Sequence, residues 1–75
     1  MNILEEVINF IREFHQGKYS GDDRLHSDIG LDSLDTLDLF AFIEREYNVR
    51  FEDEDISRMK DITLCDLVKE IERRQ

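Results

Sequence analysis

The chain has 75 residues and a formal charge of −9, and ten of its nineteen acidic residues, but only two of its ten basic ones, lie between Asp28 and Asp55. A chain of this length forms one domain with a thin core, because it buries only about 60% of the surface that it exposes when unfolded. This size favours a module on which other proteins act. The concentrated negative charge excludes nucleic acid as a partner and favours a basic protein. The alternative, that the charge only keeps a small protein in solution, stays open.

The single cysteine and the absence of long apolar runs set further bounds. Cys65 has no partner for an intramolecular disulfide or a thiolate-rich metal site, and we expect it to be a small buried apolar residue. The first six residues do not resemble a signal peptide, and no run approaches the roughly 18 apolar residues of a membrane span. We therefore expect a cytoplasmic monomer made of one free-standing domain, residues 1–75.

The first predicted element is a helix over Ile3–Gln16. Apolar residues recur there at three- and four-residue spacing, Asn2 with Glu5 resembles an N-terminal cap, and Gly17 is the expected stop. The next segment, Gly17–Gly30, is rich in turn residues and is expected to be a long loop that Leu25 and Ile29 attach to the core. Loops of this length in small domains tend to be functional.

Three more helices are predicted after the long loop. The apolar pattern predicts a helix over Ser33–Tyr47, a short helix around Glu54–Arg58 with Ile56 and Met59 facing inward, and a last helix over Thr63–Arg73. The predicted fold is therefore all-α: a small bundle of three longer helices and one short helix, with a long loop between the first and second.

A serine stands where the long loop meets the apolar second helix. Either Asp32 or Ser33 can cap this helix by accepting hydrogen bonds from its first backbone amides, and most such pairs are caps and nothing more. A phosphate ester on Ser33 would also be well placed, because helix N-termini favour anions, although Asp32 and Asp35 oppose that effect. The residues alone permit a phosphate at Ser33 but do not select one.

The surrounding sequence resembles a known motif. The stretch DIGLDSLDTLDL, residues 28–39, is similar to the phosphopantetheine attachment motif of acyl carrier proteins, whose core is Asp-Ser-Leu after a hydrophobic residue, a glycine and one further residue. The similarity spans about residues 25–73. It includes the acidic end of the second helix, which closes on Tyr47, and the acidic start of the short helix at Phe51–Asp55.

This resemblance implies a carrier rather than an enzyme. A phosphopantetheinyl transferase would esterify Ser33 with 4′-phosphopantetheine from coenzyme A, and the thiol of the arm would hold acyl groups as thioesters. Asp32 would belong to the transferase recognition motif. Acyl-transferring and condensing enzymes would bind through basic patches and an apolar contact. The implied partner face comprises the acidic residues Asp35, Asp38 and Glu44 and the apolar residues Leu34, Leu37 and Ala41.

Two aromatic residues depart from the family pattern in the second helix. Phe40 and Phe42 occupy positions where smaller apolar residues are common in acyl carrier proteins. If Phe40 faces the interior, it fills space that otherwise shelters a medium-length acyl chain, and the protein is a specialised carrier with a restricted pocket. The alternative is a core repacked with bulky residues.

Other functions have weaker support in the sequence. Neither His15 nor His26 lies in a nucleophile motif that would make Ser33 catalytic, so we predict no catalytic residue. The acidic run 52–55 lacks the spacing of an EF-hand loop, so we predict no dedicated metal site. The alternative from another class is an unmodified acidic helical adaptor. The sequence does not separate fatty-acid from polyketide or other specialised biosynthesis, although it favours an acyl over a peptidyl carrier.

Overall fold

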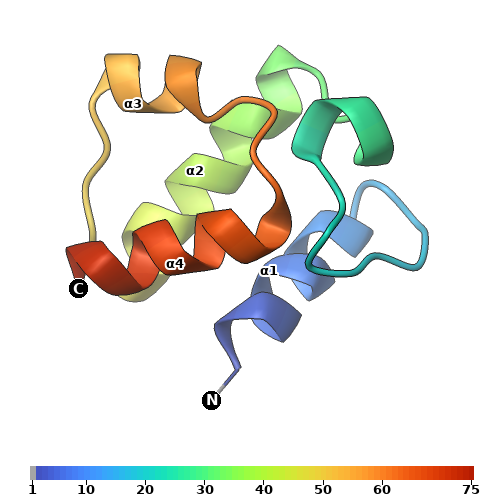
Figure 1. Ribbon diagram of the computed structural model, residues 1–75, viewed down its shortest axis with the longest axis horizontal. Helices are drawn as coiled ribbons and strands as arrows, with labels where there is room; N and C mark the ends of the chain where they lie inside the picture. Colours follow the sequence, from blue (N-terminus) through green and yellow to red (C-terminus); the bar gives the residue numbers. More distant parts are fainter. Residues whose placement is uncertain (1) are drawn as a thin grey trace.

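The computed structural model describes residues 2–75, which form a bundle of four α-helices (Figure 1). The elements in chain order are α1 (Ile3–Arg12), the π-helical turn η1 (Leu25–Ile29), α2 (Ser33–Tyr47), α3 (Asp53–Arg58) and α4 (Leu64–Arg74). Within the described residues, β pairing is limited to one isolated antiparallel bridge between Arg24 and Thr63. The predicted all-α bundle of three longer helices and one short helix is confirmed.

Helix α1 begins as predicted but ends four residues early. The Asn2 side chain accepts a hydrogen bond from the Glu5 amide at 3.2 Å, which caps the helix. At the other end, the Tyr19 hydroxyl donates to the carbonyls of His15 (2.8 Å) and Gln16 (3.1 Å), so these carbonyls are satisfied outside a helix. A Cβ atom at Gly17 would lie 2.7 Å from that hydroxyl. Gly17 therefore permits this close turn, and the helix has already ended at Arg12.

The long loop is more ordered than its sequence indicates, because it contains η1 and is attached to the segment before α4 and to the first residues of α4. Backbone hydrogen bonds join Leu25 to Ile62 (3.1 Å), Leu64 to Asp23 (2.9 Å) and Cys65 to Gly21 (2.8 Å). The carboxylate of Asp61 also accepts hydrogen bonds from the amides of His26 and Ser27 and from the Ser27 hydroxyl. As predicted, Leu25 and Ile29 are buried.

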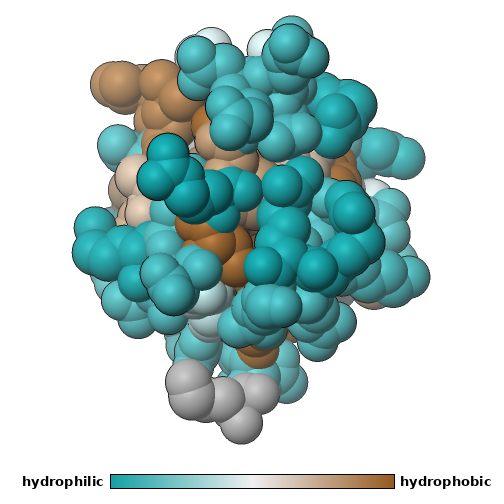
Figure 2. Space-filling view, turned by 90° about the vertical axis from the view of Figure 1, so that its left-hand side faces the viewer, coloured by the Kyte–Doolittle hydropathy of each residue, from teal (hydrophilic) through white to brown (hydrophobic). Residues whose placement is uncertain are grey.

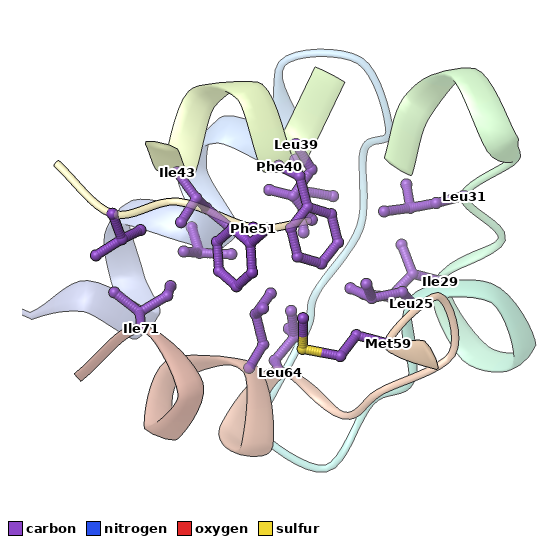
Figure 3. Packing of buried hydrophobic residues seen from close by; sticks show 14 residues of the cluster. Leu25, Ile29, Leu31, Leu39, Phe40, Ile43, Phe51, Met59, Leu64 and Ile71 are labelled. Atoms are coloured by element: carbon purple, nitrogen blue, oxygen red, sulfur yellow. The ribbon is translucent and has the colours of Figure 1, made fainter. Parts of the chain in front are cut away.

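The core is a single buried cluster beneath a largely hydrophilic surface, of which Figure 2 shows one face. Figure 3 shows Phe40 and Phe51 side by side near the centre of this cluster, and their rings meet edge to face with centroids 5.0 Å apart. Fourteen hydrophobic residues are buried: Val7, Ile11, Leu25, Ile29, Leu31, Leu39, Phe40, Ile43, Val49, Phe51, Met59, Leu64, Leu67 and Ile71. The expectation for Cys65 was wrong: it is exposed, because its neighbours Leu64 and Leu67 take the inward positions of α4.

Helices α1 and α2 also meet through aromatic side chains nearer the surface. The rings of Phe10 and Phe42 stack with centroids 4.2 Å apart and an interplanar angle of 12°. The Tyr47 hydroxyl donates a hydrogen bond to the Glu6 carboxylate. Burial, and then this hydrogen bond, raise the pKa of Tyr47 above its usual range. Phe42 is therefore half-buried at a helix contact, whereas Phe40 lies in the core.

Helix α3 is held to the bundle mainly from its ends, since none of its own residues is fully buried. Met59, its C-terminal cap, is buried as predicted, and Ile56 is half-buried. Near the other end, the Arg74 guanidinium lies 3.6 Å from the Asp55 carboxylate and 4.7 Å from the centre of the Phe51 ring. A backbone hydrogen bond from Glu52, followed by the charges of Arg74 and Arg58, lowers the pKa of Asp55.

Candidate functional site

The start of α2 is fixed by the residues just before it. Gly30 ends η1 with φ at 92°, a left-handed conformation that costs a residue with a Cβ roughly 1–2 kcal/mol. Leu31 follows and is only 1% exposed, so it anchors the chain in the core. The chain then leaves the core at Asp32 and enters the helix. The three motif residues before Asp32, which are Ile29, Gly30 and Leu31, thus set where α2 begins and in which direction it runs.

Asp32, rather than Ser33, is the N-cap of α2. Its side chain accepts a hydrogen bond from the Asp35 amide at 2.8 Å, and the Asp35 carboxylate accepts one from the Asp32 amide at 3.3 Å. These two bonds form a reciprocal capping box. The Asp32 carbonyl also accepts hydrogen bonds from the amide and the hydroxyl of Thr36. The capping function is therefore filled without the serine.

Ser33 consequently has an exposed and uncommitted hydroxyl. It is the first residue of α2, and its side chain takes no part in the hydrogen bonds formed within residues 2–75. As the first helical residue, it lies at the positive end of the helix dipole. A hydroxyl in this place is open to chemical modification by another protein.

An open groove of about 600 Å³ lies beside Ser33, where the start of α2 faces both η1 and α3. Figure 1 shows this start of α2 between η1 and α3 in the view. The residues that line the groove are His26, Leu31, Asp32, Ser33, Thr36, Asp53, Ile56, Ser57, Lys60 and Asp61. Apart from Asp32 and Ser33, the sequence did not single out these residues as a site. Segments as distant as residues 26 and 61 meet here only through tertiary contacts, and no sequence pattern marks them.

Apolar atoms make up the larger part of the groove surface, and the charged side chains that line it are of both signs. The hydrogen bonds from Ser27, and then the one from His26, lower the pKa of Asp61 and so favour its ionised form. Lys60 contributes an exposed ammonium that forms no ion pair with any other described residue. The His26 Nδ1 lies 3.1 Å from the Leu31 carbonyl, a hydrogen bond that requires the proton on Nδ1. The groove thus offers donors and acceptors as well as an apolar base formed by Leu31 and Ile56.

Four of the six residues of the implied partner face are exposed, and the other two are half-buried. Leu34 and Leu37 are 69% and 53% exposed, and Ala41 and Asp38 are exposed beside them. Asp35 is half-buried and belongs to the capping box. Glu44 is also half-buried, and its carboxylate accepts a hydrogen bond from the Phe51 amide at 2.9 Å. Glu44 therefore helps to hold the connection between α2 and α3.

The alternative chemistries gain no support from the described part of the chain. Residues 2–75 contain no cluster of three or more side chains suited to hold a metal ion. No histidine of that range donates to, or accepts from, the Ser33 hydroxyl. In the same range, none of the helices is both long and apolar enough to cross a membrane.

Comparison with known proteins identifies the family. Residues 19–71 match the family described as "phosphopantetheine attachment site". The acyl carrier protein of Rickettsia bellii (strain RML369-C) is 37% identical over 65 residues, which cover 81% of this chain and 74% of that protein. The mitochondrial acyl carrier protein of Saccharomyces cerevisiae is 30% identical over 67 residues. That alignment covers 80% of this chain and 54% of the yeast protein, so the chain spans about half the length of this relative.

The chain belongs to the acyl carrier protein family. Members of this family hold 4′-phosphopantetheine covalently and are carriers rather than enzymes. The family, the cofactor and the carrier class predicted from the sequence are confirmed. The chain is therefore a phosphopantetheine-carrying acyl carrier.

Proposed function

We propose that Ser33 is the residue that receives 4′-phosphopantetheine, and that this chain presents acyl thioesters to fatty-acid or related specialised biosynthetic enzymes. The proposal rests on the different roles of Asp32 and Ser33 at the start of α2. Asp32 caps the helix, and the adjacent Ser33 hydroxyl is exposed and uncommitted. The match over residues 19–71 includes both residues.

The attachment step uses this hydroxyl as the nucleophile. The Ser33 Oγ forms a bond to the phosphorus of coenzyme A that bears the pantetheine, the bond from that phosphorus to adenosine bisphosphate breaks, and the hydroxyl proton passes to a base of the transferase. The product carries its phosphate at the positive end of the α2 dipole, which favours an anion. Asp32 and Asp35 oppose this effect, and we propose that Asp32 contributes instead to recognition by the transferase. Once attached, the arm supplies a thiol that holds the acyl group.

The groove beside Ser33 fits such an arm. A pantetheine chain has two amides that need hydrogen-bond partners, and the Ser57 hydroxyl and the Lys60 ammonium lie along the groove. Leu31 and Ile56 offer apolar contact for the parts between the amides. The volume of about 600 Å³ lies within the range of small-ligand sites.

We further propose that the exposed face of α2 binds the partner enzymes. Leu34, Leu37 and Ala41 would form the apolar centre of the contact, and Asp38 a charge at its edge, with Asp35 and Glu44 as partly buried acidic neighbours. Edge charges raise association rates, whereas a buried apolar centre sets how long a complex lasts. Basic patches on the transferase, and on acyl-transferring and condensing enzymes, would complement this surface.

The test is the intact mass of the purified protein after incubation with coenzyme A, magnesium and a broad-specificity phosphopantetheinyl transferase. Wild type is compared with Ser33→Ala and with Ser57→Ala, a matched control in which the lost hydroxyl lines the same groove. We expect one phosphopantetheine on wild type and on Ser57→Ala, and none on Ser33→Ala. Modification of Ser33→Ala would place the arm on another residue. Failure of all three folded proteins to gain the arm would favour the unmodified adaptor.

A further inference from the structure

The end of α2 carries the only two basic residues of the acidic segment 28–55. Arg45 lies in the last turn of the helix, and Arg50 follows shortly after its end. Both residues are exposed, and neither forms an ion pair with another residue of the range 2–75. The ion pairs of that range all join residues of α3 and α4. The two arginines therefore keep their charge available to another molecule.

An open cleft of about 470 Å³ lies at this end of α2 and contains both arginines. The residues that line it are Ala41, Glu44, Arg45, Asn48, Val49 and Arg50. Asn48 ends the helix in a left-handed conformation with φ at 55°, and Val49 is only 4% exposed. The Arg50 carbonyl accepts a hydrogen bond from the Arg74 guanidinium at 3.2 Å. The backbone between the two arginines is therefore anchored in the fold.

The charge of the cleft differs from that of the segment around it. Glu44 is the one acidic residue among those that line it, and its carboxylate accepts a hydrogen bond from the Phe51 amide at 2.9 Å. Glu46 is exposed on the same helix but does not line the cleft. Two arginines against one glutamate leave the lining positive, although the segment 28–55 is strongly acidic. This excess favours an anionic group as the occupant.

Arg45 lies on the same side of α2 as the apolar centre of the proposed partner face. Three turns of an α-helix contain about 11 residues, and Arg45 follows Leu34 by eleven positions and Ala41 by four. All three residues are exposed. Arg45 is about 16 Å from Leu34 along the helix axis. A typical interface covers about 800 Å² of each protein, a patch roughly 30 Å across, so an enzyme that covers the apolar centre also meets Arg45.

We propose that the acyl-transferring enzyme that loads this carrier presents a carboxylate to Arg45 and Arg50, next to the basic patch that meets Asp38. This rests on the proposed function, in which the exposed face of α2 binds that enzyme. Guanidinium groups suit a carboxylate, because they bind it through two parallel hydrogen bonds. The contact face then has a negative start and a positive end, and only one orientation of the enzyme along α2 satisfies both. That orientation determines where the active site of the enzyme lies relative to Ser33.

The same arginines select among enzymes. A surface that is basic along the whole length of α2 would bring a cation against Arg45, and like charges that face each other across an interface are unfavourable. Arg45 is therefore a residue that determines specificity for the enzyme. The proposal thus predicts a sign: an acidic residue at position 45 should weaken recognition by the correct enzyme, whereas it would strengthen recognition by a wholly basic one.

The experiment measures kcat/KM of the acyl-transferring enzyme from the organism that makes this chain, with the holo carrier as its substrate. The broad-specificity transferase first loads each protein to completion, and intact mass confirms the arm. Wild type is compared with Arg45→Glu and with Arg12→Glu, which have the same net charge. Arg12 is a matched control, because it is also exposed, lies in the last turn of its helix and forms no ion pair within residues 2–75.

We expect Arg45→Glu to lower kcat/KM about tenfold or more, through KM, because the carboxylate of the enzyme then faces a like charge. Arg12→Glu should stay within about twofold of wild type, since exposed charges far from the contact are screened. Equal effects of the two variants would overturn the proposal, because the effect would then follow net charge alone. A higher kcat/KM for Arg45→Glu would overturn it as well, since the enzyme would then present a basic group at that place.

Arg45→Gln keeps the test decisive if Arg45→Glu does not fold, because it removes the charge without adding an opposite one. It should lower kcat/KM by less than Arg45→Glu, and a value equal to or above that of wild type would overturn the proposal. Replacement of the carboxylate of the enzyme by arginine should restore the rate with Arg45→Glu, and the proposal fails if no aspartate or glutamate of its contact surface does so. Failure of the proposed function has a different signature, because wild type would then gain no arm in the mass.

Discussion

Two replacements of Asp32, by alanine and by asparagine, distinguish its role as a helix cap from its proposed role in recognition by the transferase. The Asp32 carboxylate accepts a 2.8 Å hydrogen bond from the Asp35 amide, and the Asp32 amide donates a weaker 3.3 Å hydrogen bond to the Asp35 carboxylate. Loss of an N-cap side chain costs about 1 kcal/mol. In a domain of this size, that cost lowers Tm by about 4–8 °C. We therefore expect Asp32→Ala to melt several degrees below wild type, whereas Asp32→Asn, which keeps a capping oxygen, should differ by only a few tenths of a kcal/mol.

The two variants are compared by thermal and urea unfolding and by the initial rate of phosphopantetheine transfer. If Asp32 is also read by the transferase, both variants should be modified more slowly than wild type, although only Asp32→Ala is destabilised. Equal destabilisation of both variants would refute the capping argument. A normal transfer rate for Asp32→Asn would show that the carboxylate charge plays no part in recognition.

Three further predictions concern the turn, the loop attachment and the exposed face. Gly30→Ala should lower the free energy of unfolding by about 1–2 kcal/mol in urea titrations, because residue 30 has φ of 92°; an unchanged midpoint would contradict this. Hydrogen bonds from Ser27 lower the pKa of Asp61 in the folded protein. Ionised Asp61 therefore stabilises the fold at a pH above its unfolded-state pKa, and this stabilisation is lost as the pH falls through the folded-state pKa. Asp61→Asn should thus be less stable than wild type at pH 7, and the difference should shrink as the pH falls through the lowered folded-state pKa of Asp61; a stability difference independent of pH would contradict this. Leu37→Asp should leave stability within about 0.5 kcal/mol, since Leu37 is 53% exposed, but should weaken transferase binding in titration calorimetry; unchanged affinity would place the partner contact elsewhere.

The sequence determined the helices and their caps because these depend on near neighbours in the chain. Apolar spacing predicted α2 with its observed bounds, and Asn2 is the cap that its position indicated. The motif around Ser33 also predicted the carrier family, which the comparisons confirm. Between the two candidate caps, the sequence left a choice that only the backbone geometry resolved in favour of Asp32.

Only the tertiary structure decided what lies around Ser33. The groove depends on η1 and α3 meeting the start of α2, and the contacts of Asp61 with residues 26 and 27 join positions more than thirty residues apart. The exposure of Cys65 and the early end of α1 likewise depend on which neighbours cover each segment. Local patterns predict which face of a helix is apolar. Which part of the chain packs against that face, and which side chains remain beside the reactive hydroxyl, is set by packing across the whole fold.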